Sequence, residues 1–178
     1  MNFQLAGIDL ELIQGDIAAQ KDIEAVVNAA NSELKIGGGV AGAIHRAAGP
    51  ELEKACRPLA PIKVGEAVIT KAFKLPNQYV IHTLGPVYGR DKPAAALLQK
   101  CYQNSLKLAE ENRIKSIAFP AISTGAFGYP IKDAADISLQ TVKETAAALE
   151  NIKIIRFVLY SKNDLNLYQN QAKKILKK

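Results

Sequence analysis

Short apolar runs rich in β-branched residues alternate along this chain with longer segments in which apolar residues recur every three or four positions. A short apolar run bounded by polar or turn residues is typical of a buried strand. Such runs predict strands at 10–14, 24–28, 66–72, 79–84, 115–119 and 154–160. The pattern also allows an extra edge strand near 2–6.

The longer segments have the period of amphipathic helices. Leu98, Cys101 and Tyr102 share one apolar face in the segment 93–112, and Pro93 stands at the favoured first helical position. The same reasoning predicts further helices at 39–48, 50–59, 131–149 and 163–177. Strands that alternate with helices predict an α/β fold, with helices packed around a largely parallel sheet.

Length and composition limit the fold further. The chain has 178 residues and is 48% hydrophobic, which is enough for the core of one domain and leaves no room for a second. No run reaches the roughly 18 to 20 apolar residues of a membrane span, and the N-terminus lacks the basic start and apolar stretch of a leader. We therefore expect a single domain over 1–178, no membrane partner and a cytoplasmic location.

The formal net charge of +6 suits an acidic ligand such as a nucleotide, a phosphate or a nucleic acid, but does not choose among them. Part of the excess lies in KKILKK at 173–178, where lysines are favourable against the dipole of a helix C-terminus in any protein. Nucleic-acid binding is therefore the less favoured interpretation of the charge.

The cysteine and histidine residues predict no metal site. Cys56 and Cys101 form no CxxC pair, and the only histidines are His45 and His82, so no metal-ligand spacing occurs. We expect both cysteines to be small buried residues. We expect both histidines to be satisfied structural residues that lack the Ser or Cys partner of a nucleophilic triad. The sequence predicts neither a metal nor a cofactor.

Glycine residues concentrate after one of the predicted strands. In the segment 26–49, a buried-type strand runs into two asparagines and then into Gly37, Gly38 and Gly39 before a helix start. Backbone N–H groups of such a turn can approach an anion at the positive end of the helix, so a diphosphate would fit. A simple connecting turn is an equally weighted alternative. Gly37, Gly39 and Gly42 also satisfy G-x-G-x-x-G, but they follow the strand too late for a dinucleotide fold, and we interpret that match as accidental.

A second loop of small and hydroxylated residues follows the predicted strand at 115–119. Its segment STGAFG at 123–128 precedes a helix that begins near Pro130 and forms another backbone nest for an anion. Two such loops at neighbouring strand ends could hold a diphosphate from both sides. Neither loop contains a P-loop or a nucleophile elbow.

Two other strand ends carry candidate contacts for a base. Asp16 follows the strand at 10–14, where its carboxylate is a preferred N-cap and could also accept a bond from an exocyclic amine. Tyr160 ends the last strand and could lie flat against a purine, although a lone aromatic there is more often core or surface filler. Both residues keep a structural alternative.

Taken together, these segments resemble the macro domain family in their order, spacing and letters, over about residues 3–170. The resemblance is carried by VVNAAN, GGGVAGAIHRAAG, YVIHTLGP and IAFPAISTGAFGYP. It implies a three-layer α/β/α sandwich with a mixed, largely parallel sheet of about six strands. It also implies an ADP-ribose ligand in a cleft across the strand C-termini.

The resemblance further implies roles for individual residues. Asp16 would accept from the adenine amine, the Ile17 backbone would meet the ring, and Tyr160 would stack on it. Asn31 would hydrogen-bond the distal ribose as the catalytic residue, with Phe127 packed against that sugar. The diphosphate would be wrapped by Gly37, Gly38, Gly39, Val40, Ser123, Thr124, Gly125, Ala126 and Phe127.

Many members of the family hydrolyse ADP-ribose from acidic side chains of proteins or deacetylate O-acetyl-ADP-ribose, whereas others only bind. We expect hydrolysis, because a water positioned by the diphosphate can attack a ribose held by Asn31 without a nucleophilic side chain. MacroD-type hydrolases carry an aspartate where this chain has Ala41, and Ile36 replaces a frequent histidine. Viral and archaeal members with alanine at that position include active hydrolases. A non-catalytic reader of ADP-ribose, and RNA or poly-ADP-ribose binding, therefore stay open as alternatives.

Overall fold

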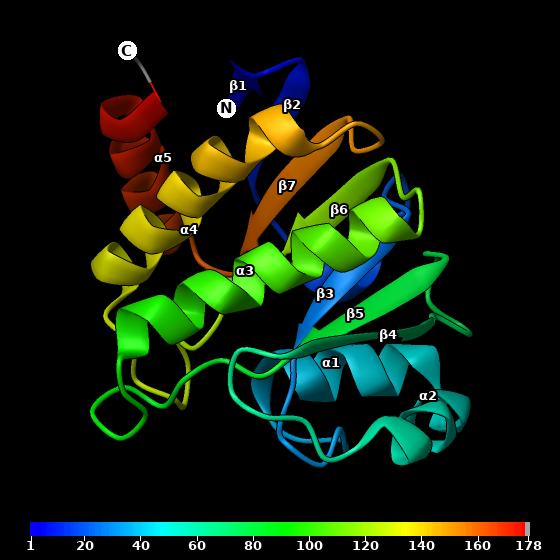
Figure 1. Ribbon diagram of the computed structural model, residues 1–178. Coiled ribbons are helices and arrows are strands. Elements are labelled where there is room, and N and C mark those ends of the chain that lie inside the picture. The colour runs from blue at the N-terminus through cyan, green and yellow to red at the C-terminus, as the bar shows by residue number, and fades with distance from the viewer. Residues whose placement is uncertain (177–178) are drawn as a thin grey trace.

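The computed structural model describes residues 1–176 and contains a sheet between two layers of helices (Figure 1). The strands are β1 (Asn2–Leu5), β2 (Ile8–Gln14), β3 (Ala25–Ala29), β4 (Ala67–Lys71), β5 (Tyr79–Thr83), β6 (Ser116–Phe119) and β7 (Ile154–Leu159). Every residue of β6 and nearly every residue of β3 and β7 is buried, as expected for strands that are covered on both faces.

The strand order in the sheet is β1-β2-β7-β6-β3-β5-β4. Neighbours from β2 through β5 in this order run parallel, whereas β1 and β4 pair antiparallel at the two edges. The sheet is therefore mixed and largely parallel, as predicted. It has seven strands rather than about six, because the edge strand that the pattern allowed near 2–6 forms as β1.

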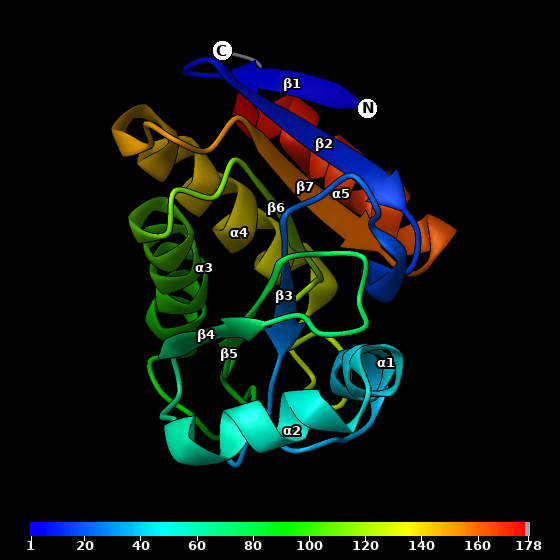
Figure 2. The ribbon, with the colours of Figure 1, turned by 90° about the vertical axis from the view of Figure 1, so that its right-hand side faces the viewer.

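The α-helices of the described residues are α1 (Gly39–Ala48), α2 (Pro50–Cys56), α3 (Ala94–Glu111), α4 (Ile131–Thr145) and α5 (Lys162–Leu176). The apolar faces of α3, α4 and α5 pack in one core and those of α1 and α2 in another. Figure 2 shows α3 and α4 on one side of the sheet and α1 on the other. The expected three-layer sandwich is confirmed.

Two predicted helices end earlier than their apolar patterns do. α2 stops at Cys56 and tightens into a 3-10 turn over Arg57–Leu59, because Pro58 has no N–H to continue the α-helical hydrogen bonds. α4 stops at Thr145 and continues as a 3-10 turn over Ala146–Ala148. Leu149, the last residue of the predicted segment 131–149, is extended.

The ends of α3 and α5 differ from the prediction by a single residue or fall at the limit of the structure. Pro93 has an extended ψ of 121° and caps α3, which begins at Ala94. α5 runs to Leu176, the last described residue, so the predicted end at 177 lies outside the described residues.

The core beneath α3, α4 and α5 is the larger of the two and is built around aromatic rings. Tyr102, Phe119, Phe157 and Tyr168 form a chain in which the centroids of neighbouring rings lie 5.1 to 6.0 Å apart. These rings belong to α3, β6, β7 and α5, so they tie two helices to the centre of the sheet. Rigid packing there fixes the strand ends from which the loops start.

The parallel strands all end at the same edge of the sheet. β3 leads into α1 on one face, whereas its neighbour β6 leads into α4 on the opposite face. The connections that follow β3 and β6 therefore leave the sheet on opposite faces. In open α/β sheets such a switch point is where ligands bind, and the fold alone points to this edge.

Candidate functional site

The predicted site residues lie in loops at that edge. We call residues 31–38, between β3 and α1, the glycine loop, and residues 120–130, between β6 and α4, the β6–α4 loop. Since β3 and β6 are hydrogen-bonded, the two loops start at neighbouring strand ends, as expected. Asp16 and Tyr160 follow β2 and β7, which are neighbours as well.

The glycine loop is braced by its own first side chain. The amide of Asn31 accepts a hydrogen bond from Lys35 N at 3.0 Å and donates one to Lys35 O at 2.8 Å. Leu34 adopts a left-handed φ of 55° and buries its side chain in the core beneath α1. The turn is thereby closed before the glycines, which stay exposed.

The glycines bring the loop close to the first turn of α1. A Cβ on Gly42 would overlap Gly37 O and lie 2.7 Å from Arg46 Nη1, so only glycine lets the loop pack there. Gly38 caps α1, and Gly39 is its first helical residue with a left-handed φ of 55°. The backbone N–H groups of a first helical turn have no intrahelical acceptor and can bind an anion.

The β6–α4 loop has a strained but well-bonded backbone. Ser123 adopts a left-handed φ of 66°, and its carbonyl accepts from Tyr129 N at 2.9 Å. Thr124 Oγ1 donates to Ala121 O at 2.8 Å, so this hydroxyl is already used within the loop. A ligand here would therefore meet mainly main-chain groups, in the concave arrangement that favours anions.

A third segment, which the sequence analysis did not assign to the site, supports the β6–α4 loop from behind. A Cβ on Gly85 would overlap Ser123 Oγ and lie 2.7 Å from Ile122 Cγ2. Tyr88 N donates to Phe127 O at 2.9 Å, and the rings of Tyr88 and Tyr129 lie 4.9 Å apart. The signal for this role was the glycine directly after the strand in YVIHTLGP.

The residues predicted to contact a base lie at the other end of the edge. Asp16 Oδ1 accepts from Ala18 N at 2.8 Å, which confirms its N-cap role, and the same carboxylate keeps acceptor capacity. The Ile17 side chain is buried behind it. Tyr160 is 88% exposed, so it is not core filler, and its ring is free to meet a flat ligand. Gly15 N donates to Leu159 O at 3.0 Å and ties the two strand ends together.

His82 is a satisfied structural residue, as expected, although a cysteine that was not expected lies beside it. His82 Nε2 lies 3.7 Å from Cys56 Sγ and 3.0 Å from Thr70 Oγ1, and its Nδ1 lies 3.1 Å from Asn28 Nδ2. Desolvation lowers the pKa of His82 to about 3, and burial raises the pKa of the Cys56 thiol to about 11. The thiol therefore stays protonated and the imidazole stays neutral, so the pair is structural and not nucleophilic.

The expectation that His45 is satisfied is wrong. Its Nε2 is buried without a hydrogen-bond partner among the described residues, and desolvation lowers its pKa. The residue belongs to α1 and is 5% exposed. His45 is structural, but at an energetic cost.

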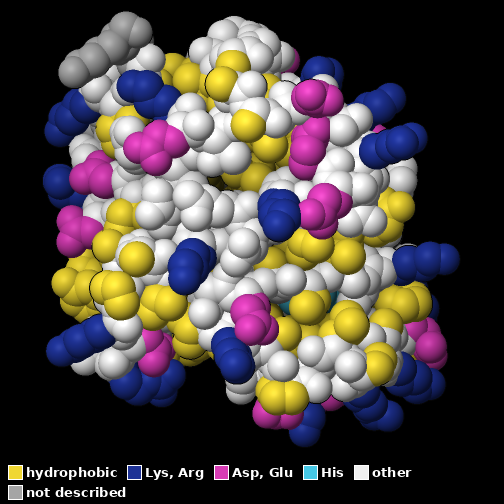
Figure 3. All heavy atoms as spheres, in the orientation of Figure 1, with side chains coloured by type: hydrophobic (Ala, Val, Ile, Leu, Met, Phe, Trp, Pro, Cys, Tyr) yellow, Lys and Arg dark blue, Asp and Glu magenta, His cyan; other side chains and the backbone are white. Residues whose placement is uncertain are grey.

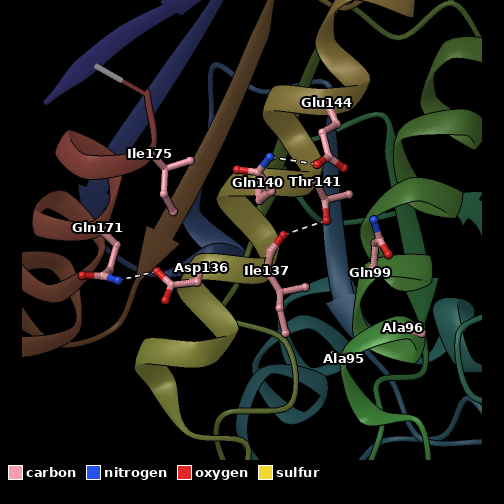
Figure 4. Close-up of a pocket in the computed structure, with 10 residues that line it drawn as sticks. All are labelled: Ala95, Ala96, Gln99, Asp136, Ile137, Gln140, Thr141, Glu144, Gln171 and Ile175. Carbon is pink, nitrogen blue, oxygen red and sulfur yellow. Dashed lines mark hydrogen bonds between the residues drawn. The ribbon is translucent and has the colours of Figure 1, made fainter. Parts of the chain in front are cut away.

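One hollow of the described residues lies away from this edge. It has a volume of about 620 Å³ and lies over α3, α4 and α5, where Ile137, Ile175 and several polar side chains line it (Figure 4). Gln140 donates to Glu144 at 2.8 Å, and Gln171 donates to Asp136. Much of the polar rim of the hollow is therefore already hydrogen-bonded within itself. On the same face, Lys and Arg side chains are interspersed with Asp and Glu and form no single basic patch (Figure 3).

Residues 1–176 contain neither a candidate metal cluster nor a candidate membrane span. No group of three or more His, Cys, Asp and Glu side chains is placed to hold a metal ion. No helix has both the length and the apolar character that a membrane span requires.

Comparison with known proteins gives matches over nearly the whole chain. A family model described as Macro domain matches residues 27–138. A macro domain-containing protein of Chlorobaculum tepidum is 50% identical over 161 residues, which cover 90% of this chain and 93% of that protein. A Salmonella typhimurium protein named O-acetyl-ADP-ribose deacetylase is 48% identical over 164 residues, covering 89% of this chain and 91% of that protein.

Solved structures also match over most of the chain. The Oceanobacillus iheyensis macrodomain with ADP matches with a TM-score of 0.95 at 40% identity. The match covers 99% of this chain and 96% of that chain. The Trypanosoma brucei macrodomain in complex with ADP-ribose has a TM-score of 0.84 at 36% identity, covering 90% of this chain and 68% of that chain.

Proposed function

Because this chain belongs to the macro domain family, we propose that residues 1–178 form a single macro domain that binds ADP-ribose and hydrolyses mono-ADP-ribose from acidic side chains of proteins. Deacetylation of O-acetyl-ADP-ribose is part of the same proposal, and the name of the Salmonella relative supports it. The ligand-bound relatives support a nucleoside diphosphate sugar as the ligand.

The order of the strands is the observation that carries the proposal. Along the sheet edge, β2, β7, β6 and β3 follow one another and present Asp16, Tyr160, the β6–α4 loop and the glycine loop in that order. The base contacts therefore come first, and the two anion-binding loops follow, the second of which begins with Asn31. Adenosine, diphosphate and distal ribose are linked in the same order. Three strand spacings of about 4.8 Å give an edge of about 14 Å for an extended ligand.

The diphosphate is bound chiefly by the backbone in this proposal. Val40 and Ala41 lie in the first turn of α1, where free N–H groups and the helix dipole favour a negative charge. Gly37, Gly38 and Gly39 keep side chains out of the path of the phosphates. On the other side, the backbone from Ser123 to Phe127 closes over the same group.

Asn31 can brace its loop and contact the ribose at once. Each carboxamide oxygen has two acceptor sites and each amide nitrogen two hydrogens, and Lys35 uses one of each. One acceptor and one donor are therefore left for the ribose hydroxyl groups. Phe127 would pack against the same sugar and exclude bulk water from it.

In the proposed hydrolysis, a water oxygen bonds to the anomeric carbon of the distal ribose as the bond from that carbon to the carboxylate oxygen of the modified side chain breaks. The carboxylate is a weak base and leaves as an anion without a protein acid. A diphosphate oxygen accepts the proton of the attacking water. The chain's own task is to position ribose, diphosphate and water.

A reader without turnover is the second candidate, and Ala41 is the observation that favours it. Ala41 is buried in the first turn of α1 and supplies no carboxylate base, unlike the MacroD-type hydrolases. Binding of RNA or poly-ADP-ribose is a third candidate that rests on the net charge of +6. The proposal also includes a cytoplasmic location, which the two free cysteines support.

The experiment incubates the chain with a protein mono-ADP-ribosylated on glutamate and measures released ADP-ribose. Asn31→Ala is compared with wild type and with Asn112→Ala. Asn112 is a matched control, because its amide also donates to a carbonyl four residues away at 2.8 Å, but at the end of α3. Hydrolysis by wild type and Asn112→Ala, and its loss in Asn31→Ala, is the expected result.

No release of ADP-ribose by wild type, with ADP-ribose binding intact in the same preparation, would favour the reader. Equal hydrolysis by all three proteins would remove Asn31 from the mechanism. Absence of ADP-ribose binding would contradict the proposed function as a whole.

A further inference from the structure

A charged side chain lies in the middle of the buried strand β7. Arg156 is 8% exposed and stands between the core residues Ile155 and Phe157. Its guanidinium donates to Glu11 Oε2 at 2.5 Å and to both carboxylate oxygens of Asp22, at 2.8 and 2.7 Å. These two carboxylates already compensate the buried charge.

The guanidinium nevertheless makes one more contact, which leads toward the ligand edge. Arg156 Nη1 donates to Gln20 Oε1 at 3.0 Å, and Gln20 Nε2 donates to Asp16 O at 2.8 Å. Gln20 is 6% exposed, and its own carbonyl accepts from Asn77 Nδ2 at 2.7 Å. Gln20 is thus fixed through its main chain and its side chain, and it connects a buried cation to Asp16.

Asp16 is in turn held on two sides. Its carbonyl accepts from Ala19 N at 3.1 Å in addition to Gln20, and its carboxylate accepts from Ala18 N at 2.8 Å. These bonds fix both the backbone of the turn and the direction of the carboxylate. The residue has little freedom left to follow a ligand that does not fit.

We propose that Gln20 and Arg156 are positioning residues that hold the Asp16 carboxylate as a reader of the base. The site then selects a nucleotide whose base presents an exocyclic amine over one that presents a carbonyl oxygen there. This rests on the proposed function, since it concerns how the same site recognises ADP-ribose.

The physical basis is the rigidity of the acceptor. A fixed carboxylate accepts from the adenine amine, but meets the carbonyl oxygen of hypoxanthine as a repulsive pair of acceptors. A carboxylate that can turn away loses part of this penalty. The selectivity of the site therefore depends on the bonds behind Asp16 as well as on Asp16 itself.

The test uses Gln20→Glu in the full-length chain. Glutamate has almost the same shape and can still accept from Arg156, but it has no N–H to donate to Asp16 O. The substitution therefore breaks one link of the connection and keeps the other. Dissociation constants are measured by calorimetry for ADP-ribose and for its inosine counterpart, which carry the same charge, so general charge effects cancel in their ratio.

For wild type we expect ADP-ribose to bind roughly 10-fold or more tightly than the inosine counterpart. In Gln20→Glu this ratio falls to within about threefold of unity, since the repulsive arrangement relaxes. Gln20→Met, which keeps the side-chain length without either bond, carries the same test if Gln20→Glu does not fold.

Asp22→Asn is the matched control. It weakens the ion pair of Arg156, at 2.7 Å, and leaves the Gln20 side chain and its bond to Asp16 O unchanged. We expect a lower midpoint of thermal unfolding and an unchanged ratio of the two constants. If the Arg156 cluster has only a structural role, both variants lower the midpoint of thermal unfolding, and neither changes the ratio of the two dissociation constants.

Three results would overturn the inference. These are an unchanged ratio in folded Gln20→Glu, an equal fall in Asp22→Asn, and equal binding of both ligands by wild type. In each of them wild type still binds ADP-ribose, so the proposed function survives. Wild type that binds neither ligand would refute the proposed function itself.

Discussion

The glycine loop and the β6–α4 loop are proposed to bind the same part of the ligand, but the chain shapes them by different means. The glycine loop is braced from within, since Asn31 bonds Lys35 four residues later. The β6–α4 loop is braced from outside by the segment after β5, where Gly85 abuts Ser123. Turn chemistry thus shapes the first loop, and tertiary contact shapes the second.

The two loops should therefore be disturbed by substitutions in different parts of the chain. A change within the glycine loop or on α1 should disturb that loop alone. A change on the segment after β5, which carries no predicted ligand contact, should disturb the β6–α4 loop at a distance. The following expectations run from the largest effect to the smallest.

Acid should lower the free energy of unfolding through a contact of β3, the strand that leads into the glycine loop. Asn28 of β3 bonds His82, whose pKa desolvation lowers from 6.5 to about 3, whereas β6 contains no histidine. An imidazole that stays neutral when folded but binds a proton when unfolded removes stability as the pH falls below about 6.5. We expect a loss of about 1.4 kcal/mol for each pH unit between about 6 and 4, measured by urea unfolding.

His82→Gln should reduce this slope, because the side chain no longer titrates. The lowered pKa of His45 has the same sign and accounts for a remaining slope. A pH dependence that is the same with and without His82 would contradict the assignment.

Gly85→Ala should be the most damaging change outside the predicted ligand contacts. The new Cβ would overlap Ser123 Oγ and crowd Ile122, so we expect a loss of about 1 to 3 kcal/mol of unfolding free energy. ADP-ribose affinity should fall at least about tenfold, a change of 1.4 kcal/mol, because the loop is displaced. Thermal unfolding and calorimetry measure the two effects.

Gly89→Ala is the control for backbone strain without a clash. Gly89 has a left-handed φ of 83°, but a Cβ there would meet nothing within 4 Å. It should cost about 1 kcal/mol and leave ADP-ribose affinity unchanged. Equal losses of affinity in the two variants would argue against support of the β6–α4 loop by Gly85.

Gly42→Ala should disturb the glycine loop from its other side. The added methyl overlaps Gly37 O, while alanine is the better helix former by about 1 kcal/mol, so the net loss of stability should be about 1 kcal/mol. Gly38→Ala sharpens the comparison, because its Cβ has open space and an ordinary φ of −83°. It should leave stability unchanged and lower ADP-ribose affinity only if the phosphates approach Gly38.

Asn31→Ala should lower stability only slightly. Its two bonds to Lys35 are exposed to water, so their loss should cost about 0.5 to 1.5 kcal/mol in thermal unfolding. No change at all would mean that the loop does not depend on its internal brace.

The sequence predicted the parts of the site that are local. Glycine runs, hydroxylated residues at strand ends and apolar periods identified both loops and six of the seven strands, and allowed the seventh, because their causes lie within a few neighbouring residues. The N-cap role of Asp16 was equally readable.

The parts that were missed depend on residues far apart in the chain. Support of Ser123 by Gly85, the contact of Cys56 with His82, and the connection from Arg156 to Gln20 all require the folded sheet. A single arginine inside the apolar run IIRFVLY was the visible signal of the last of these. Its partners could not be named before the strands were placed side by side.

The most direct test of the central claim is a calorimetric titration of the chain with ADP-ribose at low and high salt. Binding through backbone groups at the ends of β6 and β3 predicts one site per chain and an affinity that changes less than about tenfold between 50 and 500 mM salt. Absence of binding, or a loss of several orders of magnitude with salt, would contradict the claim and point instead to a surface that binds phosphates by charge.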